Sequence, residues 1–136
     1  MGRMQRTKGN RAELEVAAIF RAAGFDCDRV PNSGGLRIKG DLHGDIPVHV
    51  EVKRAERLKL PEWLAQARDE APEGVTPVLA FRRSHEPWYA CVPLEALVAL
   101  LSVARLAEVE SDGFVLTHEV LVEAVALYES RKALDA

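Results

Sequence analysis

The chain has 136 residues, 48% hydrophobic and 29% charged, so it supports one compact core and we expect a single domain. Its longest apolar stretch, residues 96–104, is far shorter than the ~20 residues that cross a bilayer, which excludes a membrane partner and predicts a cytosolic protein of a cell or an infected host. The net charge of −3 divides into +4 for residues 1–60 (12 basic, 8 acidic) and −7 for residues 61–136 (6 basic, 13 acidic), so the first part favours phosphate binding, although an ordinary solvated surface fits equally well.

The first predicted element is a helix over residues 11–23. Asn10 is a favoured N-cap residue, apolar side chains recur at helical spacing between residues 14 and 20, and Gly24 is a suitable stop. Residues 25–30 then predict a short strand. The sequence Pro-Asn-Ser-Gly-Gly at residues 31–35 is typical of a loop.

A β-hairpin is predicted next. Residues 41–42 and 48–52 are of β type, and residues 43–47 have the composition of a turn. If the two strands pair about Ile46, Asp41 lies directly opposite Glu51. Like charges at that spacing are destabilising unless a cation compensates them.

The second half predicts a helix over residues 61–71 with a proline in its first turn, and strands over residues 75–81 and 88–92. A helix is predicted from Pro93 to about residue 106, and a last helix from residue 117 to about 133. This order predicts an α/β fold with a central mixed sheet flanked by helices. We expect its core at about residues 8–92 and a helical extension at about 93–136.

Asp41, Glu51 and Lys53 form the constellation with the clearest chemistry. Glu51 and Lys53 are two residues apart on a strand, so their side chains emerge on the same face. Two carboxylates can hold Mg²⁺, and a nearby ammonium can orient an attacking water, which phosphodiester hydrolysis requires. A surface hairpin with a cross-strand ion pair is the alternative. His49 could approach this site, but a lone strand histidine more often has a structural or exposed role.

Several short motifs occur in an order that resembles the PD-(D/E)xK nuclease superfamily, and in detail its archaeal-type and phage-type Holliday-junction resolvases. They are Lys-Gly-Asn-Arg-Ala-Glu-Leu-Glu at residues 8–15, Ala-Gly-Phe at 23–25, the loop at 31–35, Gly-Asp at 40–41 and Glu-Val-Lys at 51–53. The resemblance covers about residues 8–92. Gly40 stands where the superfamily name has proline, and the chain after Pro93 matches no part of the core.

The resemblance implies a restriction-endonuclease-like core in which Asp41, Glu51 and the backbone carbonyl of Val52 bind Mg²⁺ or Mn²⁺. It places Lys53 next to the attacking water, Glu13 at the same site and Ser33 near the scissile phosphate.

Some residues that the resemblance adds to the site also have structural explanations. Asn10 and Glu13 have the spacing of a capping box, although Glu13 falls on the inward helix face whereas Glu15 is expected to face outward. Ser33 is equally well explained as a turn residue. The resemblance also implies that Gln66 faces the site from the following helix, and the alternative is a solvated polar residue.

The resemblance also implies an endodeoxyribonuclease that resolves four-way DNA junctions, and paired cuts favour a homodimer. Another repair, restriction-like or flap nuclease of the superfamily, or a non-catalytic DNA-binding module, is the alternative. The candidate phosphate contacts are basic residues of the first part of the chain: Arg3, Arg6, Lys8, Arg11, Arg29, Arg37, Lys39, Arg54, Arg57 and Lys59.

Overall fold

A computed structural model describes residues 3–31, 40–110, 130 and 133–134. The chain divides into two compact units, residues 1–92 and 93–136. The division falls at Pro93, where the sequence predicts the helical extension to begin. None of the described helices combines the length and apolar character that crossing a membrane requires.

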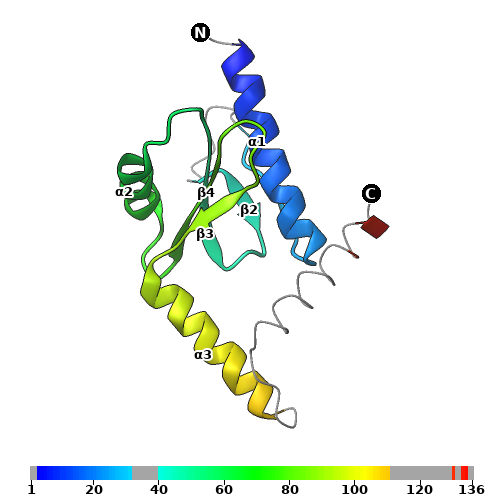
Figure 1. Ribbon diagram of the computed structural model, residues 1–136, viewed down its shortest axis with the longest axis vertical. Coiled ribbons are helices and arrows are strands. Elements are labelled where there is room, and N and C mark those ends of the chain that lie inside the picture. The colour runs from blue at the N-terminus through cyan, green and yellow to red at the C-terminus, as the bar shows by residue number, and fades with distance from the viewer. Residues whose placement is uncertain (1–2, 32–39, 111–129, 131–132, 135–136) are drawn as a thin grey trace. The chain divides into compact units, whose positions relative to one another are not determined.

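Helix α1, Arg3–Ala22, begins about two turns earlier than the sequence predicts (Figure 1). Residues 3–8 include arginine, methionine, glutamine and lysine, which are good helix formers, and Gly9 costs only about 1 kcal/mol in a helix. Asn10 therefore lies inside the helix, and its assignment as an N-cap was wrong. The capping-box explanation of Glu13 is therefore wrong as well.

Strands β1, Cys27–Arg29, and β2, Leu42–Gly44, form an antiparallel pair with Cys27 opposite Gly44 and Arg29 opposite Leu42. The predicted hairpin between β2 and the following strand was therefore wrong in its pairing. Gly44 has φ +140°, and a Cβ there would collide with the backbone of Asp26. This glycine lets β2 lie close to the backbone at the start of β1, which favours the β1–β2 pairing over the predicted β2–β3 hairpin.

The main sheet contains β3, Val48–Arg54, β4, Thr76–Arg82, and β5, Tyr89–Cys91, in that order. β3 and β4 are parallel, and β4 and β5 are antiparallel. A parallel pair needs a crossover, and α2, Leu60–Glu70, provides it with Pro61 in its first turn. The predicted mixed sheet flanked by helices is confirmed.

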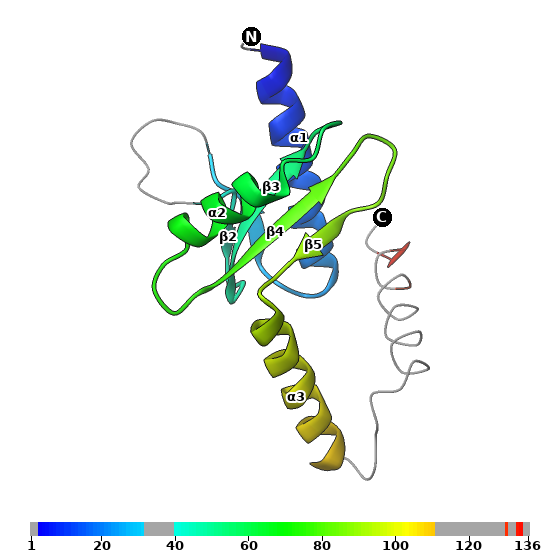
Figure 2. The same cartoon turned by 60° about the vertical axis from the view of Figure 1, so that its left-hand side comes forward.

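Helices α1 and α2 lie on opposite sides of β3 and β4 in both views of the fold (Figures 1 and 2). Side chains alternate along β3 accordingly. Val50 and Val52 join a buried cluster with Ala12 and Val16 of α1. His49 and Glu51 emerge on the other face of the strand.

Glu15 does not face outward as expected from the helical pattern. It accepts hydrogen bonds from Trp88 Nε1 at 3.1 Å and pairs with Arg82 Nη2 at 3.0 Å. The Arg82 guanidinium in turn lies 5.3 Å from the centre of the Trp88 ring. Glu15 therefore connects α1 to Arg82 at the end of β4 and to Trp88 just before β5.

In the second unit, α3 spans Leu94–Glu110 and agrees with the helix predicted after Pro93. The last predicted helix, residues 117–133, lies almost entirely outside the described residues.

Candidate metal centre

Asp41 is fixed beside β3 by two hydrogen bonds. Its backbone N–H donates to Val50 O at 3.0 Å, and its Oδ2 accepts from the Val52 N–H at 2.7 Å. These bonds flank Glu51, so the structure brings Asp41 and Glu51 together without a β2–β3 ladder.

Glu51 is the most unusual carboxyl group of this site because only 2% of the residue is exposed. Burial, a hydrogen bond with Glu70 and the nearby Asp41 raise its pKa to about 9. Removing a carboxylate from water among other acids favours its neutral form. A divalent cation reverses this preference, since it supplies the positive charge that the surrounding acids lack.

His49 lies on the same strand face as Glu51. Its Nε2 is 3.4 Å from Glu51 Oε1, and neither atom has a hydrogen-bond partner among the residues that the structure describes. Burial lowers the pKa of His49, so its imidazole is neutral and has a nitrogen lone pair. Ligand atoms of His49, Glu51 and Glu70 all lie within 4.8 Å of one another.

The backbone conformation of Gly40 explains why glycine stands where the superfamily name has proline. It has φ +93°, whereas proline is restricted to about −65°. A Cβ at this position would also lie 2.8 Å from His49 Cε1. The imidazole thus occupies the space that any larger residue at position 40 would need.

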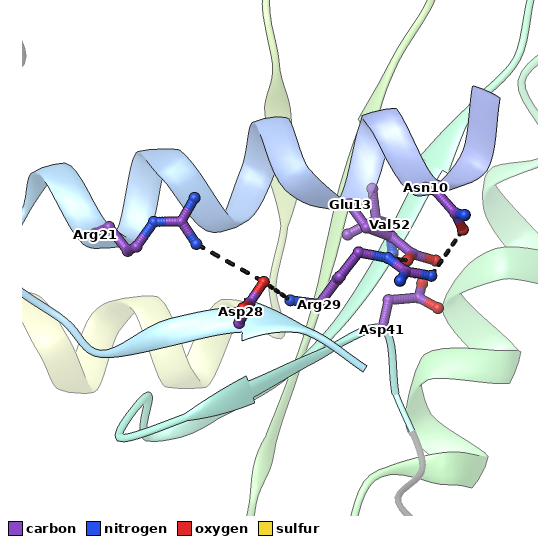
Figure 3. Close-up of polar contacts among 7 residues, drawn as sticks. All are labelled: Asn10, Glu13, Arg21, Asp28, Arg29, Asp41 and Val52. Carbon is purple, nitrogen blue, oxygen red and sulfur yellow. Dashed lines mark hydrogen bonds and ion pairs between the residues drawn. The ribbon is translucent and has the colours of Figure 1, made fainter. Parts of the chain in front are cut away.

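Glu13, on α1, lies beside Asp41 (Figure 3). Burial and the charge of Asp41 raise its pKa, and Arg29 opposes them. Arg29 Nε donates to Glu13 Oε2 at 3.1 Å, and its Nη2 donates to Asn10 Oδ1 at 2.7 Å. Asn10 therefore helps to hold Arg29 against Glu13, which is a different use from the predicted helix cap.

The remaining predicted site residues lie around this group. Lys53 is half-buried and follows Glu51 by two residues, so it emerges on the same strand face. The Gln66 side chain donates to Glu70 Oε1 at 3.3 Å. Ser33 lies outside the described residues.

Sequence reasoning set His49 aside and did not single out Glu70. The alternation of His49 with Glu51 was visible, but Glu70 becomes a neighbour of Glu51 only through the packing of α2 on β3. A carboxylate four residues after Gln66, on the same helix face, was the available signal.

A hollow with a basic lining lies beside the amino-terminal part of α1. Its lining is Arg3, Met4, Thr7, Lys8 and Arg11 of α1 with Arg54 of β3. It gathers four of the predicted phosphate contacts. Arg57 and Lys59 are exposed after β3, whereas Arg29 is engaged with Glu13. The Arg6 side chain, Arg37 and Lys39 lie outside the described part of the chain.

Comparison with protein families matches residues 4–124 to the family described as "phage putative PDDEXK endonuclease". This span contains Glu13, Asp41, Glu51 and Lys53, and the mixed sheet between helices is compatible with a restriction-endonuclease-like fold. Neither the curated proteins nor the solved structures give a match. Nucleases of this superfamily generally use divalent metal ions, which the buried Glu51 and the partly buried Asp41 fit. The chain therefore belongs to this family of PD-(D/E)xK endonucleases.

Proposed function

We propose that the protein is an endodeoxyribonuclease that uses Mg²⁺ or Mn²⁺ to hydrolyse DNA phosphodiesters at the site formed by Glu13, Asp41, Glu51 and Lys53. The single observation that carries this proposal is the buried Glu51 carboxyl group beside Asp41. Two neighbouring acids, one of them buried, are stable together when one is protonated or when a cation lies between them. The second state is the active one.

Each residue has a role that its position supports. A bound divalent ion would polarise a phosphoryl oxygen and lower the pKa of a water molecule. Asp41 and Glu51 would hold this ion together with the carbonyl oxygen of Val52. The hydrogen bond from the Val52 N–H to Asp41 Oδ2 holds the Asp41 carboxylate against β3, beside Glu51. The Lys53 ammonium would orient the attacking water and stabilise negative charge on the phosphate.

Glu13 would act from the α1 side of the same site. Arg29 limits the rotamers of Glu13 and offsets its charge, since their side chains are joined at 3.1 Å and are mostly buried. We assign Glu13 to the positioning of a water or metal-bound ligand, with Arg29 as its support.

We further propose branched DNA as the substrate, and a four-way junction in particular. The order of motifs along residues 8–53 resembles junction resolvases, and the basic hollow beside α1 suits contacts to a phosphate backbone, which carry no sequence information. Two-fold related strands require two active sites, so a homodimer is the economical assembly. Exposed apolar side chains of α3, including Leu94, Val98 and Leu100, are candidates for its interface.

Cleavage of labelled DNAs tests this proposal. A four-way junction, a linear duplex and a flap of the same sequences are incubated with the protein and Mg²⁺, Mn²⁺ or EDTA. Symmetric metal-dependent cuts in the junction support a resolvase. Equal cleavage of all three DNAs supports a less selective nuclease of the family. Binding without metal-dependent cleavage contradicts the enzyme assignment and supports a DNA-binding module.

A further inference from the structure

A second group of ligands lies on the α2 side of Glu51. β3 directs His49 and Glu51 away from α1, and Glu70 is the last residue of α2. One ligand atom from each residue lies within 4.8 Å of the other two. This group differs from the acids already assigned, because it includes neither Asp41 nor Glu13 and it contains a nitrogen ligand.

Two of these ligand atoms lack partners although they are buried. The side chains of His49 and Glu51 are 5% and 2% exposed, and His49 Nε2 faces Glu51 Oε1 at 3.4 Å. Neither atom has a hydrogen bond within the described part of the chain. Buried polar atoms almost always have partners, so this pair requires an explanation. One cation bound at about 2.1 Å from each atom would produce this separation at an ordinary coordination angle.

The surroundings hold two of the ligands in place. The His49 ring packs against the backbone at Gly40, where even a Cβ would come within 2.8 Å of the ring. The Gln66 amide donates to Glu70 Oε1 at 3.3 Å. Groups that orient metal ligands in this way are a regular part of metal sites.

We infer that His49, Glu51 and Glu70 form a second cation position, which takes a divalent transition-metal ion such as Mn²⁺ or Co²⁺ in preference to Mg²⁺. Imidazole is a good ligand for transition metals, whereas Mg²⁺ prefers an all-oxygen shell that includes several waters. The inference rests on the proposed function only through Glu51, which both positions share. Its third ligand, Glu70, comes from a different element than Asp41.

Titration of the full-length protein with Co²⁺, followed by calorimetry and by the visible absorption of the bound ion, tests this position without any nuclease assay. We expect His49→Gln and Glu70→Gln each to weaken Co²⁺ binding about tenfold or more. His43→Gln and Glu73→Gln are matched controls, since both residues are exposed, and they should bind Co²⁺ as the unchanged protein does. Co²⁺ affinity that is unchanged in folded His49→Gln and Glu70→Gln overturns the inference.

Two further measurements keep this result separate from the nuclease proposal. In the unchanged protein, Co²⁺ should shift or broaden the ring-proton NMR signals of His49. Bound Co²⁺ that leaves these signals unaffected overturns the inference, even if the variants do not fold. Conversely, Asp41→Asn should retain the Co²⁺ absorption signature, and if that variant and the unchanged protein both fail to cleave DNA, the nuclease proposal fails while the second position stands.

Discussion

The Asp41 carboxylate accepts a hydrogen bond of 2.7 Å from the backbone N–H of Val52, the residue that follows Glu51. This bond places a carboxylate from outside the main sheet against the middle of β3. It also explains why the two acids meet without the predicted hairpin. Asp41 is positioned by one side-chain hydrogen bond and one backbone hydrogen bond to β3. An asparagine could form both bonds, so we expect metal binding to depend on the charge of this residue and the fold to depend on it much less.

Asp41→Asn tests that distinction. The amide oxygen can still accept the Val52 N–H, so the fold should be retained, while the loss of an anionic ligand should reduce metal-dependent cleavage by more than about a hundredfold. Single-turnover cleavage and thermal unfolding measure the two effects. Asp45→Asn is the matched control, because Asp45 is exposed in the turn before β3, and it should leave both quantities unchanged. Equal losses of activity in the two variants would refute the assignment.

The stability of the metal-free protein should fall as pH rises from 7 to 9. The pKa of Glu51 is raised from 4.5 to about 9 by burial and by Glu70 and Asp41, so the folded state holds a proton that the unfolded state has released. Stability from this proton is complete below the unfolded pKa and is lost as pH approaches the folded pKa, which amounts to about 2 kcal/mol over this window. The lowered pKa of His49 acts below pH 7 and does not interfere.

Thermal unfolding in EDTA at pH 7, 8 and 9 measures this trend. Glu51→Gln should remove most of it, because the amide does not titrate, while the Cys27 thiol, whose pKa is raised by burial, still contributes near pH 9. Mn²⁺ should raise the midpoint most at pH 9, and an ion at a hundred times its Kd adds about 2.7 kcal/mol. A midpoint that stays constant with pH in EDTA, or that Mn²⁺ leaves unchanged, would contradict the location of the cation.

Arg29→Ala should destabilise the metal-free protein by about 2 kcal/mol, because it leaves Glu13 beside Asp41 without the Arg29 charge that offsets it. The Arg29 and Glu13 side chains are 21% and 12% exposed, so solvent screens their interaction only partly. Arg83→Ala removes an exposed ion pair with Glu86 of similar length, 2.9 Å, and should cost no more than about 0.5 kcal/mol. Urea unfolding compares the two variants, and equal costs would show that the Arg29 contact has no special importance.

Salt dependence of DNA binding tests the basic hollow. Arg3→Ala and Lys8→Ala should each reduce the slope of log K against log salt by about 1, since each removes one phosphate contact. Arg68 is exposed on α2 and does not line the hollow, so Arg68→Ala should leave the slope unchanged. Titrations of a junction in EDTA keep cleavage out of the measurement. Slopes that change equally in all three variants would argue for a diffuse charge effect.

The sequence alone predicted the order of the helices and strands, and it predicted that Asp41 and Glu51 lie close together. Hydrophobic spacing located α2, β3, β4 and β5 to within about two residues, because each segment has a regular period and clear end signals. The spacing of the Gly-Asp and Glu-Val-Lys motifs indicated that Asp41 and Glu51 are neighbours. This part of the prediction holds although β2 pairs with β1 and not with β3.

Local rules failed where a distant segment decided the outcome. Asn10 is a good cap residue, yet the helix-forming residues before it continue α1 and Asn10 binds Arg29 instead. β2 had a nearby hairpin partner in the sequence, but Gly44 permits close pairing with β1. Glu70 gave almost no local signal, since its proximity to Glu51 depends on how α2 packs after the crossover.

The most direct test of the account is the single-turnover cleavage rate of a labelled four-way junction by the unchanged protein and by Lys53→Ala, measured over a series of Mn²⁺ concentrations. We predict cleavage that saturates with Mn²⁺ and is absent in EDTA, and a rate at least about a hundredfold lower for Lys53→Ala at saturating Mn²⁺. Cleavage at equal rates by both proteins, or no cleavage of any DNA by the unchanged protein with Mn²⁺ or Mg²⁺, would contradict it.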